Sequence, residues 1–274
     1  MAGRLVVCPT PIGNMEDITE RVKVALSEAD IVACEDTRRT GLLFERLGLR
    51  RPRLVSNHEG NESERARQLV AAIERGCKVA LISDAGTPAV SDPGYRLIGA
   101  CIDRSIDVQV LPGPSAVVTA LVVSGLPTDR WRFEGFLPRR AGELERVLGG
   151  GQTVVAFESP RRLPESLAAL SALAPERPAA VCRELTKMHE EVVRGTLLEL
   201  TRRFRDGVKG EIVVVIGPAA RESSSPDIAF AVDALRRLVQ SGARPRAAAS
   251  VVAALTGTRA NELYTALTGR EPRE

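Results

Sequence analysis

The sequence is poor in aromatic residues and lacks long hydrophobic runs. Phe, Trp and Tyr make up only 3% of its 274 residues, which argues against RNA recognition by aromatic stacking platforms. No stretch of about 18 consecutive apolar residues occurs, so we expect no membrane-spanning helix. The apolar run near the N-terminus is too short for a secretion signal. These absences favour a folded cytoplasmic protein.

The five cysteines occur singly and never form a CxxC pair, and most of them lie in apolar runs. This pattern predicts reduced cysteines in the core of an intracellular protein rather than disulfides, and it makes a zinc site unlikely to exist. We therefore expect no metal. The positions are Cys8, Cys34, Cys77, Cys101 and Cys182.

Several common catalytic motifs are also missing. There is no GxxxxGK[ST] phosphate loop, no GxGxxG after the first predicted strand and no GxSxG serine motif. His58-Glu59 lacks the second histidine of a metalloprotease, because position 62 is Glu62. These gaps exclude the usual nucleotidases, dinucleotide enzymes, serine hydrolases and zinc proteases.

The basic residues are almost all arginine. Of 38 basic residues only four are lysine, and the formal net charge is +3. Arginine contacts phosphate in a bidentate manner that lysine cannot reproduce. An arginine-rich composition with so small a net charge is nevertheless more often a solvated surface, so it does not by itself establish an acidic partner.

The first half of the chain alternates apolar strand-like runs with helical periodicity. The strand-like runs are nearly continuously apolar, which predicts a mostly parallel sheet covered on both faces. We assign residues 1–122 to an N-terminal α/β domain of this kind. Its expected strands are 5–8, 31–34, 53–55, 79–82 and 108–111.

The segment 124–140 breaks this rhythm and is interpreted as a linker. A second α/β domain is expected over 131–219, with strands at 153–157, 179–182 and 211–216, helices near 162–173 and 197–205, and a turn at Arg194-Gly195. The polar stretch "ARESSSPD" then precedes a helical module, 226–274, with helices near 228–240, 246–255 and 259–268. Its spacing resembles a small helix-turn-helix unit that docks substrate or caps the second domain.

Small Pro- and Gly-rich loops follow three of the five strands of the first domain. They are "PTPIGN" (9–14), "SDAGTPAVSDPG" (83–94) and "PGPSA" (112–116). In an open parallel sheet, the carboxyl ends of the strands lie at one edge, and ligands bind there. The sequence therefore predicts a binding cleft that grips a small ligand with backbone amides and short side chains.

Eight short motifs in order carry a family resemblance. "PTPIGNMEDIT", "EDTRRTG", "SDAGTP…SDPG", "LPGPSA", "GLPTDR", "EGFLPR", "ESPRR" and "RELTK" resemble the cytidine 2′-O-methyltransferases of small-subunit (16S) ribosomal RNA, a family within the tetrapyrrole methylase superfamily. The resemblance implies S-adenosylmethionine as cofactor and two α/β domains with the site between them. It also implies a homodimer that acts on ribosomal RNA of the decoding region.

Transferred motif by motif, the resemblance implies a set of cofactor-binding residues in the strand-end loops. These are Pro11, Ile12, Gly13, Asp84, Ala85, Gly86, Thr87, Gly113, Ser115, Ala116, Phe157 and Glu158. For Asp84, a helix-cap or turn role is as reasonable from the residue alone. Gly86 and Gly113 equally suit simple turns.

Methyl transfer to a ribose hydroxyl benefits from a base and from nearby cations. We predict that an acid of "EDTR", Glu35 or Asp36, acts as the base and that Arg161 and Lys187 orient the substrate. The arginines expected to contact RNA are Arg38, Arg139, Arg140, Arg162 and Arg183. Two alternatives stay open: a small-molecule methylase acting on a tetrapyrrole, and a non-catalytic ligand-binding module of ribosome assembly.

Overall fold

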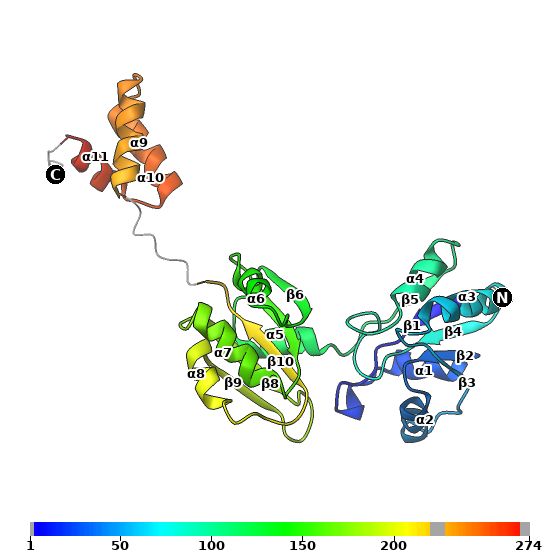
Figure 1. Cartoon of the computed structure of the whole chain (residues 1–274). Coiled ribbons are helices and arrows are strands. Elements are labelled where there is room, and N and C mark those ends of the chain that lie inside the picture. Colours follow the sequence, from blue (N-terminus) through cyan, green and yellow to red (C-terminus); the bar gives the residue numbers. More distant parts are fainter. Residues whose placement is uncertain (1–2, 220–227, 269–274) are drawn as a thin grey trace. The chain divides into compact units, whose positions relative to one another are not determined.

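The computed structural model describes residues 3–219 and 228–268. The chain divides into two compact units, Met1–Pro218 and Ala219–Glu274. The first unit contains two five-stranded sheets, and the second contains three helices (Figure 1).

The first sheet is parallel throughout and has the strand order β3-β2-β4-β1-β5. This confirms the prediction of a mostly parallel N-terminal sheet. Its strands are β1 (Arg4–Val7), β2 (Ile31–Cys34), β3 (Arg53–Ser56), β4 (Lys78–Leu81) and β5 (Val108–Val110). The helices that follow them are α1 (Glu20–Glu28), α2 (Thr37–Arg46), α3 (Glu62–Glu74) and α4 (Tyr95–Ile102), with a short 3₁₀ turn at Met15–Asp17.

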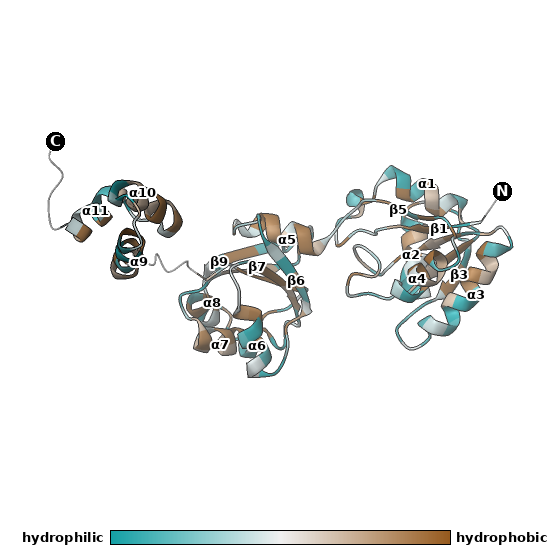
Figure 2. Cartoon of the chain, turned by 90° about the horizontal axis from the view of Figure 1, so that it is seen from above, coloured by the Kyte–Doolittle hydropathy of each residue, from teal (hydrophilic) through white to brown (hydrophobic). Residues whose placement is uncertain are grey.

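Both faces of this sheet are covered, which explains why its strands are apolar at successive positions. Leu5 and Val7 pack with buried residues of α3 and α4, whereas Val6 between them packs with α1 and α2. Side chains alternate across a strand, so a strand buried on both faces shows no polar alternation. The strands are accordingly hydrophobic and the exposed helix faces hydrophilic in Figure 2.

The second sheet is mixed and has the order β6-β7-β10-β8-β9. Only β6 and β7 run parallel, and the other neighbours are antiparallel. Its strands are β6 (Trp131–Phe136), β7 (Thr153–Glu158), β8 (Pro178–Arg183), β9 (Glu191–Thr196) and β10 (Ile212–Ile216). Its helices are α5 (Ala116–Ser124), α6 (Ala141–Leu148), α7 (Leu163–Leu173) and α8 (Leu197–Arg203).

Two local predictions in this region are wrong. The segment 124–140 is no linker throughout, because β6 lies within it and pairs with β7. Phe133 of β6 contacts Phe157 edge-on at 5.1 Å between ring centroids, so its aromatic residues serve the sheet. The expected turn at Arg194-Gly195 is part of β9 instead, where Arg194 donates to the carbonyl of Ser124.

Helix α5 packs against the second sheet, although its residues fall largely within the range 1–122 assigned to the N-terminal domain. Val117, Ala120 and Leu121 are buried together with Val155 and Val213 of the second sheet. The chain therefore crosses from the first sheet to the second just before α5.

Cys8, Cys34, Cys101 and Cys182 are buried free thiols, as predicted, and Cys77 is half-buried. Burial raises the pKa of Cys8 and Cys182 to about 12 and that of Cys101 to about 11, so these thiols stay protonated. Among the described helices, none is long and apolar enough to cross a membrane.

The second unit consists of α9 (Ile228–Gln240), α10 (Pro245–Thr256) and α11 (Ala260–Thr268), close to the predicted bounds. Leu235, Val252 and Leu263 form its buried core together with small alanines. Gly257 ends α10 with a φ of 69°, a left-handed conformation that favours glycine at a helix end.

Candidate functional site

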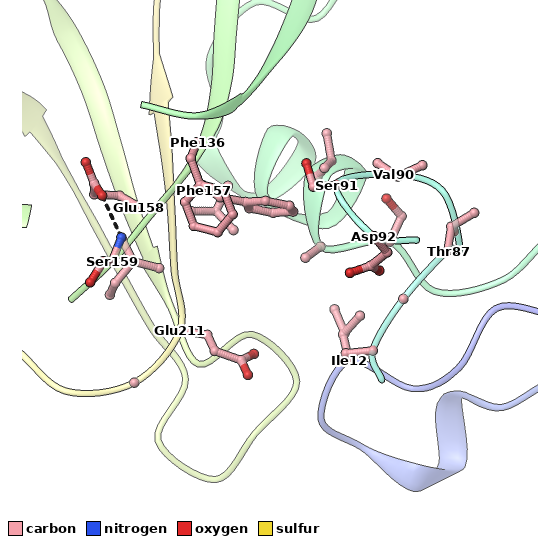
Figure 3. A pocket seen from close by; sticks show the side chains of 18 of the residues that line it. Ile12, Thr87, Val90, Ser91, Asp92, Phe136, Phe157, Glu158, Ser159 and Glu211 are labelled. Atoms are coloured by element: carbon pink, nitrogen blue, oxygen red, sulfur yellow. Dashed lines mark hydrogen bonds between the residues drawn. The ribbon is translucent and has the colours of Figure 1, made fainter. Parts of the chain in front are cut away.

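A pocket of about 400 Å³ lies where the loops of the first sheet face the second sheet, within the unit of residues 1–218. The loops after β1, β4 and β5 form one wall, and the end of β7 with the start of β10 forms the other (Figure 3). The lining residues are Ile12, Ala85–Thr87, Val90–Asp92, Ser115–Val117, Phe136, Phe157–Pro160 and Gly210–Val213. The strand-end loops that the sequence singled out are thus brought together.

Hydrogen bonds between these loops make the first wall rigid. Thr10 and Gly86 exchange two backbone hydrogen bonds of 2.9 and 3.0 Å, which join the loops after β1 and β4. The hydroxyl of Thr87 donates to the carbonyl of Pro114 and joins the loop after β5. Ser83 donates to the carbonyls of Ala85 and Gly86. The wall is therefore formed before any ligand binds.

The predicted glycines serve contacts between loops. A Cβ on Gly113 would lie 2.7 Å from Pro9, and one on Gly13 would lie 2.5 Å from Cγ of Lys187. Gly86 has a φ of 77° and its backbone is already paired with Thr10. Glycine is needed at Gly13 and Gly113 because neighbouring loops approach closely, and at Gly86 because of its left-handed backbone. Of the three, only Gly86 also lines the pocket.

The first turn of α5 opens into the pocket. The Ser115 hydroxyl accepts a hydrogen bond from the amide of Val118 and so caps the helix. The amides of Ala116 and Val117, the next residues, have no acceptor within the helix. Both residues line the pocket, so the positive end of the α5 dipole lies at the pocket wall.

The second wall combines aromatic rings with a buried carboxylate. Phe136 and Phe157 lie edge-on at 5.7 Å and face the pocket (Figure 3). The side chain of Glu158 is fully buried, accepts from the hydroxyl of Ser166 and the amide of Ser159, and pairs with Arg162 at 3.3 Å. Glu158 therefore fixes the turn after β7 and has few free lone pairs for a ligand.

Asp92 lines the pocket and was missed by the sequence analysis. Burial, the largest effect, raises its pKa to about 6; a hydrogen bond with Ser83 opposes this, and the charges of Glu35 and Asp84 add to it. The residue belongs to the quoted loop 83–94, so its place in the sequence was visible, whereas its burial among other acids was not.

A second, charged hollow of about 530 Å³ lies on the other side of the loop that follows β4. It is lined by Glu35–Arg39, Ser56 and Asp84. Asp84 does not line the pocket: its carboxylate pairs with Arg39 at 3.0 Å and accepts from the amide of Asp36 at 3.4 Å. Asp84 therefore joins the loop after β4 to the start of α2, whose N-cap is Asp36.

The two predicted acids in this hollow have opposite electrostatic settings. The Asp36 carboxylate caps α2 and pairs with Arg38, and these hydrogen bonds lower its pKa. Burial, followed by the charge of Asp84, raises the pKa of Glu35. Of the two, Glu35 is thus the better proton acceptor near neutral pH.

Most other predicted cations are engaged in ion pairs. Lys187 pairs with Glu184 at 2.9 Å and with Glu211, a pocket residue, at 3.0 Å. Arg162 binds Glu158 and the carbonyl of Leu137, and Arg183 pairs with Glu191 at 3.0 Å. Arg139, Arg140 and Arg161 are exposed, and Arg161 follows Ser159 and Pro160 of the pocket wall. Pro11 is buried outside the lining.

The sequence model of the tetrapyrrole (corrin/porphyrin) methylases matches residues 4–201. The chain belongs to the tetrapyrrole methylase family. The match spans the first sheet and every strand of the second sheet except β10, and it includes the pocket lining except Gly210–Val213.

Two relatives within this family are similar to the chain over most of their length. The chain is 49% identical to "Ribosomal RNA small subunit methyltransferase I" of Mesorhizobium japonicum, over 95% of this chain and 90% of that protein. A protein of the same name from a Hydrogenobaculum strain is 44% identical over 78% of this chain and 95% of its own length. The latter has about the length of the first unit.

The fold of this family member also occurs in a solved structure. Uroporphyrin-III C-methyl transferase from Thermus thermophilus, complexed with S-adenyl homocysteine, matches 78% of this chain and 97% of that one. The TM-score is 0.55 and the sequence identity 21%. At this sequence identity, the likeness shows that the two proteins share a fold.

Proposed function

We propose that this methylase transfers a methyl group from S-adenosylmethionine to the 2′-hydroxyl of a cytidine in the decoding region of small-subunit ribosomal RNA. The observation that carries the proposal is the 49% identity, over 95% of the chain, to a protein named for methylation of that RNA. A cytoplasmic homodimer, which the family resemblance implies, is part of the same proposal.

The pocket between the sheets fits the cofactor. Its volume of about 400 Å³ lies within the range of small-molecule sites. The amides of Ala116 and Val117 suit the carboxylate of the methionine end, and Ile12 and Phe157 suit its apolar parts. The related transferase that holds S-adenyl homocysteine has the same fold, which supports this assignment.

Further cofactor contacts are proposed for Ala85, Gly86, Thr87 and Ser115, which also line the pocket. S-adenosylmethionine supplies an activated methyl group on a positively charged sulfur. The carboxylates of Asp92 and Glu211 lie in the same pocket (Figure 3) and would offset positive charge on the bound cofactor.

The protein must hold the acceptor hydroxyl in line with the methyl carbon, about 3–3.5 Å away, and take up its proton. As the 2′-oxygen bonds to the methyl carbon, the carbon–sulfur bond breaks and its electron pair stays on sulfur. We assign the proton to the Asp92 carboxylate. Asp92 lines the pocket, and its pKa of about 6 leaves it ionised yet basic at neutral pH.

Glu35 is retained as a second acid of this site, on the far side of the loop 83–87. Lys187, which orients Glu211, is proposed as a positioning residue at the pocket edge. Arg139 and Arg161 are exposed and are proposed to contact RNA phosphates. Arg38, Arg140, Arg162 and Arg183 pair with carboxylates and would contribute less.

The test is methyl transfer from labelled S-adenosylmethionine to small ribosomal subunits that lack the modification. After digestion to nucleosides, we expect the label in 2′-O-methylcytidine. Label on a base, or transfer only to an added tetrapyrrole, would contradict the proposal. Subunit binding without any transfer would favour the non-catalytic alternative.

A further inference from the structure

A groove of about 420 Å³ runs along the edge strand of the first sheet. One side of β3 pairs with β2, and its other side has no strand neighbour among the described residues. The groove lies between this strand and α3. It spans the four residues of β3, about 10 Å at the usual rise of a strand.

Arginines dominate the charge of this groove. Arg53 of β3, together with Arg65 and Arg75 of the α3 segment, lines it, and the rest of the lining is apolar or neutral: Ile31, Leu54, Val55, Ser56, Gln68, Leu69 and Ala72. No acidic residue belongs to this described lining. The groove thus gathers three positive charges without a carboxylate to neutralise them.

The three guanidinium groups are largely free to bind an anion. Arg53 and Arg75 form no ion pair with any described residue. Arg65 donates from Nη1 to Gln68 at 2.7 Å, while its Nε is buried without a hydrogen-bond partner in the described structure. A buried, unpaired donor is costly unless a ligand satisfies it.

The groove leads to the charged hollow beside the pocket. Ser56, at the end of β3, lines both the groove and the hollow. Arg51, just before β3, lies against the start of α2, with Nη2 at 3.5 Å from the carbonyl of Thr37. Arg38 and Arg39 follow in the hollow. A row of arginines therefore connects the groove to the loop 83–87, which bounds the proposed cofactor site.

The arginines of the hollow are paired with carboxylates, whereas those of the groove are not paired with any described carboxylate, and this difference favours phosphate binding in the groove. In the hollow, Arg38 and Arg39 are paired with Asp36 and Asp84, and Glu35 adds a further acid. A phosphate there would face carboxylates. In the groove it would meet arginines alone, which bind phosphate in a bidentate manner.

We infer that the groove between β3 and α3 binds the sugar–phosphate backbone of the substrate RNA and leads the strand toward the cofactor pocket. This inference rests on the proposed function, because it specifies how the same acceptor RNA is held. Arg53, Arg65 and Arg75 contact phosphates and leave base identity to be read elsewhere.

The test compares two triple variants of the full chain with equal loss of charge. The groove variant is Arg53→Gln/Arg65→Gln/Arg75→Gln. The control variant, Arg21→Gln/Arg202→Gln/Arg205→Gln, removes exposed arginines of α1 and the α8 region that line neither the groove nor the hollow. Methylation of small subunits is measured over a series of salt concentrations, with cofactor affinity by calorimetry.

For the groove variant we expect kcat/KM for subunits to fall at least about tenfold near physiological salt. The slope of log kcat/KM against log salt should become shallower by about three, one for each lost phosphate contact. Cofactor affinity and kcat at saturating subunits should not change. For the control variant, kcat/KM for subunits and its salt slope should stay near the wild-type values.

If the two triple variants had the same kcat/KM for subunits and the same salt slope, the inference would be overturned. If the groove variant unfolds, Arg53→Gln/Arg75→Gln keeps the half-buried Arg65, and an unchanged salt slope in that variant would also overturn it. Failure of the proposed function looks different, because wild type itself would then transfer no methyl group to subunits. Inorganic phosphate alone, added as a competitor, should weaken subunit binding only at far higher concentration than a short RNA does.

Discussion

The pocket and the hollow differ in chemistry, although four consecutive residues of the loop 83–87 take part in lining them. On one side, Ala85–Thr87 line an apolar pocket together with Ile12, Val117 and Phe157. On the other, Asp84 lines a hollow whose remaining residues are almost all charged or polar. One loop thus separates a space suited to a small, partly apolar molecule from a surface suited to charged groups.

We propose that this contrast allows one short sequence motif to serve two partners. Asp84 directs its carboxylate to Arg39 and α2, while the residues after it turn toward α5 and the second sheet. Asp92 lies in the pocket yet interacts electrostatically with Glu35 and Asp84 across the loop. We therefore propose that the cofactor binds on one side of the loop and that the charges on the other side face the RNA, with Asp92 between them.

The largest effect is expected for Asp92→Asn. If its carboxylate accepts the proton, kcat should fall by about 10²–10⁴. Cofactor affinity should fall much less, because the amide keeps the size of the side chain and Glu211 still offsets the cofactor's positive charge. In wild type, activity should rise with pH up to about 6, where Asp92 loses its proton, and this rise should vanish in the variant. Single-turnover methylation across pH measures both.

Glu35→Gln is the matched control for that experiment, because Glu35 lies on the other side of the loop. It should reduce kcat far less than Asp92→Asn does. If Glu35→Gln reduced kcat more than Asp92→Asn does, Glu35 would be the proton acceptor, and it is one of the two acids that the sequence predicted for this role.

Ala116→Phe should fill the pocket from the start of α5. Overpacking of this kind costs about 1–3 kcal/mol, so we expect cofactor affinity to fall about 30-fold. Val118→Phe, two residues along the same helix, is the control because Val118 is 49% exposed and lies outside the lining. Calorimetric titration with S-adenosylmethionine compares the two variants. Equal affinities would mean that the start of α5 does not contact the cofactor.

Asp84→Asn tests the hollow, and here we expect cofactor affinity to change little and subunit binding to become stronger. Because its carboxylate pairs with Arg39 rather than facing the pocket, cofactor affinity should stay within about twofold of wild type. Arg39 is largely exposed, so this pair should contribute only about 1 kcal/mol to folding. Release of Arg39 should strengthen subunit binding modestly. A large loss of cofactor affinity would mean that Asp84 contacts the ligand after all.

The smallest expected effect concerns stability. The raised pKa of Asp92 means that the folded state holds this proton more tightly than the unfolded state does. Between about pH 4 and 6 the folded state therefore binds more protons, and its stability falls as the pH rises.

Above this window the buried charge carries its full cost, about 1 kcal/mol after allowance for partial exposure. Asp92→Asn should raise the unfolding free energy by about that amount at pH 8 and by almost nothing at pH 4. Urea unfolding at the two pH values measures the difference, and an equal gain at both would refute the electrostatic cause.

The sequence predicted most of the elements but not how they pack. The five strands of the first sheet were recognisable because burial on both faces leaves continuous apolar runs. Strand β6 was missed because the arginines and glycine of 124–140 resemble a linker, and only its pairing with β7 completes the strand. The register of such a pairing is not contained in local composition.

The site was predicted at the level of loops, and individual residues were less predictable. Ile12, Ser115 and Ala116 line the pocket, as the motif resemblance implied. Gly13 and Gly113 instead permit close contact between loops, and glycine in a sequence looks the same in either case. Asp92 gains its chemistry from burial and from acids distant in sequence, which no local pattern reveals.

A crystal structure of the chain with S-adenosylhomocysteine bound would test the proposed cofactor site most directly. We expect the ligand to lie between Ala85–Thr87, the first turn of α5 and Phe157, with its carboxylate near the amides of Ala116 and Val117. A ligand found instead in the hollow lined by Glu35, Arg39 and Asp84 would contradict the assignment of the two sides of the loop.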